Sequence, residues 1–266
     1  MHVSGDGADT VFFTLLAENG EDTNLHFRKL SIRGYSPGAI WLGGSRAYRY
    51  GFNSNNSITD CIFQNMGNLD YPQKKMCYGV VDLINSRNFR IDYCTFMDCA
   101  NANLQPFPVQ ATSETGVEAL PIICIYFAHS SVDGIVAYCD FRRIKGDAVR
   151  IRESSHRTII HDNYSQQTGW NAVYSMWFCH PLYTTCVTEI EECPSWENRI
   201  YNNIAEGNWL CEKPRMFKDM QPHFPFGTSC PYNTNWQRAR VYENASTKCE
   251  PNSGDMRIGK EFEENN

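Results

Sequence analysis

The sequence predicts an all-β solenoid, in which the strands of each coil pair in parallel with the same strands of the next coil. The first observation is an internal repeat, whose clearest units are 78–100, 121–145 and 146–170, of 23, 25 and 25 residues. The second is the content of each unit, which holds two short apolar runs joined by Ser or Asn turns. A β-propeller blade would need about 40 residues, and a β-sandwich does not require near-identical units, so stacked coils explain the repeat best.

Four segments share one pattern: an aliphatic residue, Cys or Asp three positions later, and an aromatic residue two positions after that. They are SITDCIF (57–63), RIDYCTF (90–96), IVAYCDF (135–141) and TIIHDNY (158–164). A second apolar run precedes three of them: GVVDLINS (79–86), CIYFAHSS (124–131) and DAVRIRESS (147–155). Coils stacked about 4.8 Å apart turn like positions into internal ladders. The expected ladders are Ile58, Ile91, Val136 and Ile159; Phe63, Phe96, Phe141 and Tyr164; and Cys61, Cys94 and Cys139, followed by Asp162.

These repeats resemble the right-handed parallel β-helix of the pectate-lyase-like superfamily. The resemblance covers roughly residues 9–207, with irregular coils at 9–37, 38–68 and 171–207. It implies a right-handed β-helix of about six coils. Loop insertions are expected at about 101–120 and 179–197. Residues 208–266, rich in Pro, Trp and Cys, are expected to form a C-terminal cap and a polar tail, because a solenoid must cover its terminal apolar coil.

Composition excludes several classes of protein. The 266 residues are 42% hydrophobic and 20% charged, and no apolar run approaches the roughly 20 residues of a membrane span. A membrane protein, a coiled coil and a disordered chain are therefore excluded. The net charge of −6 argues against nucleic acid as a partner. The N-terminal MHVSGDGADT lacks the basic and apolar regions of a signal peptide, so we expect either prior processing or a start within a longer protein that has further N-terminal structure.

The chain has 12 cysteines and no C-x-x-C motif, which favours disulfides over a metal site. Disulfides would place the protein outside the cell, and buried free thiols are the alternative. The alternative applies best to the ladder of Cys61, Cys94 and Cys139, which lies inside the expected coils. From Cys179 onward, the cysteines fall in loops and the cap, where disulfides are expected.

A candidate site is expected on the outward face of the strand that contains Arg150. Because Val149 and Ile151 must face the core, Arg150 and Arg152 face outward. Aligning the Ser turns places Asp82, Tyr126, Arg150 and Tyr174 in one outward column, beside Ile84, Ala128, Arg152 and Met176. A slip of one residue in the register between coils would turn each side chain inward.

The same part of the chain is basic. Between residues 142 and 157 the net charge is +4, while the rest of the chain sums to −10. Arginine pairs bidentately with carboxylates, and tyrosine rings stack on sugars, so an acidic, uronic-acid polysaccharide is the expected partner. The alternative is that these arginines form surface ion pairs with nearby Asp and Glu residues, which contribute little to stability.

If the protein is an enzyme, β-elimination from a uronate fits these residue types. The reaction needs a cation at the carboxylate, a base for the C5 proton and an acid for the leaving oxygen. The expected catalytic residues are Arg150, Arg152, Tyr126 and His129. The expected substrate-binding residues are Asp82, Lys145, Tyr174, His156 and Arg143. The stretch GDAVRIRESSHRTIIHDNY (146–164) also resembles the arginine-bearing coil of alginate and chondroitin lyases, but Ala128 and His129 stand where that family has its lysine base.

Two other functions stay open: a non-catalytic glycan-binding or adhesive β-helix, and an inverting glycoside hydrolase. Hydrolysis needs two suitably spaced carboxylates, and the sequence offers only Asp82 outward, with Asp147 and Glu153 nearby and no adjacent Asp pair. No cofactor is expected; calcium is an alternative, although no D-x-D-x-D motif is present. No membrane partner is expected.

Overall fold

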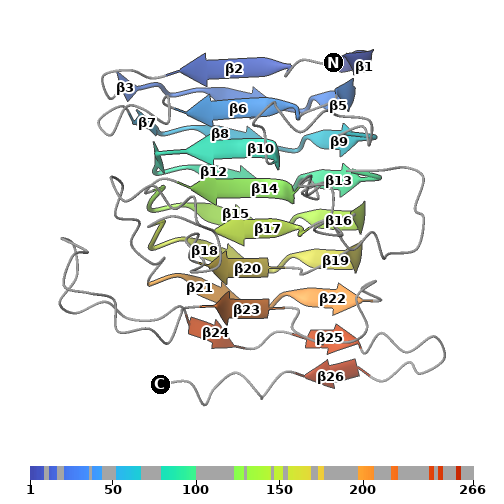
Figure 1. The fold of residues 1–266 in the computed structure, drawn as a ribbon, viewed down its shortest axis with the longest axis vertical. Helices are drawn as coiled ribbons and strands as arrows, with labels where there is room; N and C mark the ends of the chain where they lie inside the picture. Colours follow the sequence, from blue (N-terminus) through green and yellow to red (C-terminus); the bar gives the residue numbers. More distant parts are fainter. Residues whose placement is uncertain are drawn as a thin grey trace, which may run out of the picture.

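The computed structural model shows an all-β chain (Figure 1). The described residues are 1–8, 12–16, 21–35, 38–43, 52–66, 79–99, 123–128, 131–144, 147–151, 155–168, 173–176, 197–206, 217–220, 240–242, 245–247 and 256–258. Their regular structure consists of strands alone. Within these ranges there is no helix of the length and apolarity that a membrane crossing requires.

The strands form four sheets, which we call A to D. Sheet A has the order β1 (His2–Ala8), β5 (Ser31–Tyr35), β9 (Ile62–Gln64), β13 (Thr95–Met97), β16 (Asp140–Ile144), β19 (Tyr164–Thr168), β22 (Ile204–Glu206), β25 (Ala245–Thr247) and β26 (Met256–Ile258). Sheet B has the order β2 (Phe13–Leu16), β6 (Ile40–Gly43), β10 (Gly79–Ile84), β14 (Ile123–Ala128), β17 (Val149–Ile151), β20 (Val173–Met176) and β23 (Phe217–Met220). Sheet C contains β11 (Ser86–Arg87), β7 (Asn53–Ser54) and β3 (Glu21–Asp22). Sheet D has the order β24 (Arg240–Tyr242), β21 (Arg199–Tyr201), β18 (Ile159–His161), β15 (Ile135–Ala137), β12 (Arg90–Asp92), β8 (Ser57–Thr59) and β4 (His26–Arg28).

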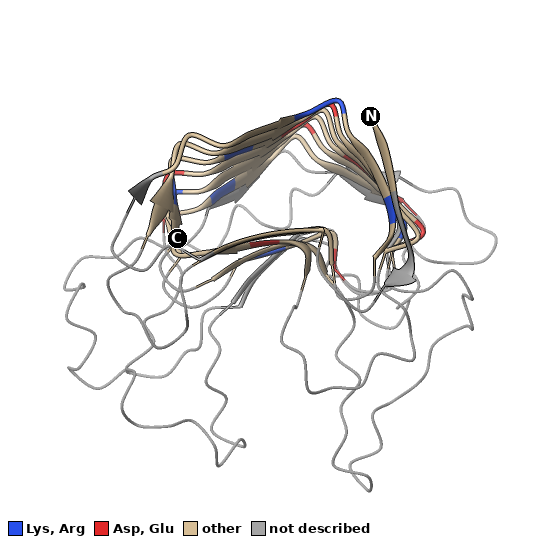
Figure 2. Cartoon of the chain, turned by 90° about the horizontal axis from the view of Figure 1, so that it is seen from above, with Lys and Arg blue, Asp and Glu red and all other residues tan. Residues whose placement is uncertain are grey.

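The chain passes through the sheets in a fixed order. β10 lies in sheet B, β11 in C, β12 in D and β13 in A, and β14 returns to sheet B beside β10. From above, successive strands superpose and the three larger sheets surround a common interior (Figure 2). The described pairs are parallel except β25–β26, an arrangement consistent with a parallel β-solenoid. Parallel pairing extends past residue 207, since β23, β24 and β25 pair with β20, β21 and β22.

Left-handed backbone conformations make the corners between the sheets. The C–D corner holds Asn24, Asn55, Asn88, Asp133, Arg157 and Glu197, with φ between 48° and 57°. The D–A corner holds Lys29, Asp60, Tyr93, Tyr138, Asp162 and Asn202, with φ between 53° and 55°. Asn and Asp tolerate this conformation better than other non-glycine residues, which explains why the turns are rich in them. Tyr93 and Tyr138 are bulky exceptions, and their rings stack with centroids 5.0 Å apart.

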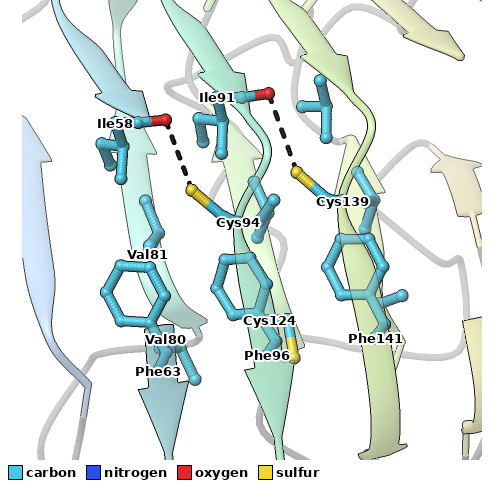
Figure 3. Close-up of a cluster of buried hydrophobic side chains, with 14 of the residues drawn as sticks. Ile58, Phe63, Val80, Val81, Ile91, Cys94, Phe96, Cys124, Cys139 and Phe141 are labelled. Carbon is cyan, nitrogen blue, oxygen red and sulfur yellow. Dashed lines mark hydrogen bonds between the residues drawn. The ribbon is translucent and has the colours of Figure 1, made fainter. Parts of the chain in front are cut away.

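Ladders of like side chains build the core, as the repeat predicts. The rings of Phe63, Phe96 and Phe141 stack with centroid distances of 4.8 and 5.1 Å (Figure 3). Beside them the thiols of Cys94 and Cys139 donate to carbonyl oxygens of the preceding coil, at 3.4 and 3.8 Å. Stacked aromatic pairs stabilise by about 0.5–1.5 kcal/mol beyond the area that they bury.

The predicted ladders are wrong by one residue in the fourth segment. Val136 pairs with Ile160 rather than Ile159. Phe141 pairs with Ser165, so Tyr164 does not continue the aromatic ladder and pairs with Asp140 instead. Because Ile159 and Ile160 are both aliphatic, the apolar pattern fits either register.

Asn163, rather than Asp162, follows the cysteine ladder. Its Oδ1 accepts a hydrogen bond from Cys139 N at 2.9 Å, and its Nδ2 donates to Val136 O at 3.1 Å and to Asn203 Oδ1 at 2.9 Å. An amide has both a donor and an acceptor for the coils on either side, whereas an ionised carboxylate such as that of Asp162 only accepts. Asp162 takes the corner position, where φ is 53°.

All five described cysteines are buried thiols, and the described residues contain no disulfide. They are Cys61, Cys94, Cys99, Cys124 and Cys139. The other cysteines, in which disulfides stay a prediction, lie outside the described residues: Cys77, Cys179, Cys186, Cys193, Cys211, Cys230 and Cys249.

These thiols predict a loss of stability at alkaline pH. The pKa of Cys61 is raised by a hydrogen bond with the Cys94 thiol and by burial. The pKa of Cys94 is raised by a hydrogen bond with the Cys139 thiol and by burial. Burial also raises the pKa of Cys124. The unfolded thiols ionise near their ordinary pKa of 9.0 while the folded ones stay protonated. The free energy of unfolding is therefore unaffected below that pH and falls above it, by about 1.4 kcal/mol per pH unit for each thiol. Urea titrations across this range measure the slope, and Cys94→Ala should make it shallower; an unchanged slope would contradict the assignment.

Gly134 is required by the packing of Phe89. A Cβ at Gly134 would lie 1.9 Å from Phe89 Cζ, and the Phe89 ring is buried against Phe127 with centroids 5.1 Å apart. We expect Gly134→Ala to lower the free energy of unfolding by about 1–3 kcal/mol, because the ring must leave its place. Urea denaturation measures the loss. In the Phe89→Leu background the same substitution should cost less, and an equal cost would show that the ring is not the obstacle.

Candidate functional site

The candidate site is a column of residues at equivalent backbone positions along sheet B. Asp82 pairs with Tyr126, Tyr126 with Arg150, and Arg150 with Tyr174, so the register predicted for these four residues is confirmed. The column continues one strand further at each end, to Trp41 on β6 and Lys218 on β23. We call these six residues the polar column. Its strands lie one above another in Figure 1, about 4.8 Å apart.

The described part of the column lies on the face of sheet B that is turned away from the main core. Val81, Ile125 and Val149 belong to the main core cluster, and alternate residues of a strand point to opposite faces. Tyr126 instead belongs to a second cluster, which also contains Ile84, Ile123 and Ala128, with Trp41 packed against it. Asp82, Tyr126 and Arg150 therefore point away from the main core, as predicted, but the expectation that they face solvent is wrong, because all three are buried.

Unlike an open groove, the centre of the column is shielded from solvent. Asp82, Tyr126 and Arg150 are 3%, 1% and 5% exposed, and each has interaction partners within the protein. Trp41 is only partly buried. Charges in such a water-poor setting interact more strongly than they do at a surface.

Arg150 forms a buried ion pair with Asp147. Arg150 Nε lies 2.6 Å from Asp147 Oδ2, and the two side chains are 7% and 0% exposed. The backbone of Asp147 is fixed to the neighbouring strand, because Cys124 N donates to Asp147 O at 3.0 Å. Asp147 therefore orients the guanidinium and compensates its charge.

Three other arginines of the basic stretch also form ion pairs. Arg142 pairs with Asp140 at 2.7 Å, Arg143 with Asp98, and Arg157 with Asp133 at 2.7 Å. The hydrogen bond that each guanidinium donates to its carboxylate raises the pKa of the guanidinium, and the bond from Arg157 lowers the pKa of Asp133. These pairs are far more exposed than Arg150–Asp147, so each contributes little to stability. The surface ion pairs considered as an alternative from the sequence are therefore present.

The structure brings together some of the predicted site residues. Asp82, Tyr126 and Arg150 are adjacent in the column, and Tyr174 follows them by backbone register. Arg143 lies at the end of β16, paired with Asp98, and His156 forms a bridge with Val132 at the C–D side of the coil, so neither is in the column. Arg152, His129 and Lys145 lie outside the described residues.

Sequence reasoning did not assign Trp41, Asp147 or Lys218 to a ligand site. Trp41 falls in a segment whose coil is irregular, but Ile40 and Leu42 on either side are core residues, and this alternation is a usable signal. Lys218 lies in the segment expected to form the cap. Asp147 precedes its strand, where no periodicity marks it.

Among the residues that the structure describes, no three or more His, Cys, Asp or Glu side chains lie close enough together to hold a metal ion. What the polar column offers is a phenol, a guanidinium and a carboxylate on adjacent strands. These groups suit proton transfer and carboxylate recognition.

Comparisons with known proteins assign no family to this chain. No family model, no curated protein and no solved structure matches it.

Proposed function

We propose that the protein is a secreted, right-handed β-helix of the pectate-lyase-like kind that acts on an acidic polysaccharide by β-elimination at the polar column. The observation that carries the proposal is the register, which sets Tyr126 one strand from Asp82 and one strand from Arg150. A phenol beside a guanidinium, on the face turned away from the core, matches the needs of this reaction.

In the proposed reaction, the Arg150 guanidinium neutralises the carboxylate of a uronate unit and so makes its C5 proton more acidic. Tyr126, acting as its phenolate, removes that proton and becomes a phenol. The C4–O bond to the next sugar then breaks as the C4–C5 double bond forms, and the leaving oxygen takes up the proton from the Tyr126 phenol, which returns to the phenolate. The chain is cut into a fragment with an unsaturated end and a fragment with a new hydroxyl group. The water-poor surroundings of Tyr126 and Arg150 strengthen the attraction between the guanidinium and the developing negative charge.

The second candidate is a glycan-binding module that does not cleave its ligand. The observation that favours it is the Arg150–Asp147 pair at 2.6 Å, because a carboxylate already compensates the charge of Arg150. In this function Arg150 would still hydrogen-bond a ligand, but it would stabilise a substrate dianion less strongly.

Incubation with alginate, pectate, glucuronan and glycosaminoglycans tests the proposal. A lyase generates unsaturated ends, so ultraviolet absorbance should rise with time for at least one polymer. Retention on a column of the same polymers without a rise in absorbance would overturn the lyase and favour the binding module. Neither retention nor turnover with any polymer, with or without calcium, would overturn both functions.

A further inference from the structure

We propose that the D–A corner carries a second binding surface, separate from the polar column, which takes an uncharged, extended polysaccharide. This surface goes beyond the proposed function, because it contains no residue of sheet B. The inference starts from the exposed apolar side chains among the described residues. Apart from Met1, the large ones are Ile62, Tyr93, Tyr138 and Ile204, and all four lie at this corner or two residues after it. Apolar side chains gathered on one exposed edge indicate a binding surface, whereas single ones do not.

Four aromatic rings follow the corner over consecutive coils. Tyr93 and Tyr138 occupy the corner position itself, with ring centroids 5.0 Å apart. His161 lies 5.5 Å from Tyr138, and Tyr201 lies 5.2 Å from His161. We call these four residues the aromatic ridge. Its two tyrosines are 55% and 45% exposed, so a ligand reaches them without any rearrangement of the protein.

The spacing of the aromatic ridge suits a linear ligand with a short repeat. The rings come from successive coils, so the ridge repeats about every 4.8 Å along the solenoid. An extended polysaccharide offers one pyranose ring over a similar length, each with an apolar C–H face and hydroxyl groups at its edge. A tyrosine matches both parts, because it has an apolar ring and a hydroxyl group that donates and accepts hydrogen bonds. The planes of Tyr138 and His161 are 80° apart, so the four rings do not all cover one another face to face.

Carboxylates on either side of the two tyrosines favour an uncharged sugar. Asp60 takes the corner position on the coil before Tyr93, and Asp162 takes it on the coil after Tyr138. Their side chains are 38% and 35% exposed. Each carboxylate has one basic neighbour and keeps further acceptor sites for the hydroxyl groups of a sugar. The same two charges would repel a uronate, which separates the ligand of this surface from that of the polar column.

The order of these charges disfavours a second copy of the chain as the occupant. Along the corner, aspartate, tyrosine, tyrosine and aspartate read the same in both directions. A two-fold axis that packed the corner against itself would therefore set Asp60 of one copy against Asp162 of the other, and like charges oppose association. Two exposed tyrosines with Ile62 beside them are also far fewer than the roughly 20–30 residues that each side of a stable protein interface supplies.

Calorimetric titration with oligosaccharides of one length tests the surface. The uncharged probes are cellohexaose, mannohexaose and xylohexaose, and the acidic probe is the β-1,4-linked glucuronate hexamer, which is cellohexaose with a carboxylate on each ring. We expect the wild type to bind at least one uncharged probe, and Tyr93→Asn and Tyr138→Asn each to weaken that binding about fivefold by removing a ring. Asparagine suits the left-handed corner, as Asn202 in the same column shows, so thermal unfolding should find both variants folded.

Two corner carboxylates provide matched variants. Asp60→Asn should narrow the preference for the uncharged probe over the glucuronate hexamer. Asp133→Asn, at the C–D corner, should leave that preference unchanged. The surface is wrong if no uncharged probe binds, or if both tyrosine variants bind as tightly as the wild type; the proposed function, which depends on sheet B, would then still stand. In sedimentation velocity we expect a monomer, and a dimer that Tyr93→Asn dissociates would overturn the polysaccharide in favour of a second copy.

Discussion

Asp147→Asn should lower the free energy of unfolding by about 3–5 kcal/mol, because it removes the carboxylate charge that pairs with the buried Arg150 guanidinium. The two side chains are 7% and 0% exposed, and water cannot replace the lost carboxylate. Urea denaturation of the variant and the wild type measures the change.

An exposed pair in the same protein provides a matched control. Arg157 Nε lies 2.7 Å from Asp133 Oδ1, nearly the distance in the Arg150–Asp147 pair, but these side chains are 48% and 49% exposed. We expect Asp133→Asn to cost less than about 1 kcal/mol, since water screens and resolvates the remaining charge. Equal costs for the two substitutions would contradict the buried character of the Arg150–Asp147 pair.

The double variant Asp147→Asn/Arg150→Met isolates the cause. Removing both charges leaves neither member of this pair as an uncompensated buried ion, so most of the stability lost in Asp147→Asn should return. If the double variant is as unstable as Asp147→Asn, the loss comes from packing rather than from an uncompensated charge. This comparison also bears on function, since an Arg150 variant that is inactive because it is unfolded says nothing about chemistry.

The sequence predicts the repeat well because a ladder fixes one residue type at one interval. The in-register pairing of Ile58, Ile91 and Val136, and of Phe63 with Phe96 and Phe141, follows directly from the shared pattern. The pattern fails at 158–164, where two isoleucines in succession allow two registers. What decides between them is hydrogen bonding: Asn163 satisfies groups on both neighbouring coils. An apolar pattern does not contain that information.

The candidate site is likewise predicted from the sequence only in part. Alternation around Val149 and Ile151 predicts the face of Arg150, and the Ser turns predict its neighbours in the column. The burial of the column and the pairing of Arg150 with Asp147 depend on distances across the coil, which no local spacing encodes. Composition likewise leaves open whether the cysteines of the core ladder are free thiols or form disulfides, because a cysteine count does not distinguish the two.

Tyr126→Phe should reduce kcat by about 10²–10⁴-fold on the polysaccharide that the wild type cleaves, with little change in KM. The substitution removes one oxygen and keeps the ring, which is 1% exposed and packs with Ile84, Ile123 and Ala128. The fold should therefore survive at a cost of about 1 kcal/mol for the hydroxyl group's own contacts, as urea denaturation would show. Initial rates of ultraviolet absorbance increase give kcat and KM.

Tyr138→Phe makes the same chemical change at the D–A corner, on a residue 45% exposed, and should leave both constants unchanged. If kcat falls in Tyr126→Phe but not in Tyr138→Phe, while KM and stability are kept, the Tyr126 phenol acts on the reacting proton. Equal activity of the two variants would contradict that role. The polar column would then position the ligand through Arg150, and the proton would have to be removed by a different residue.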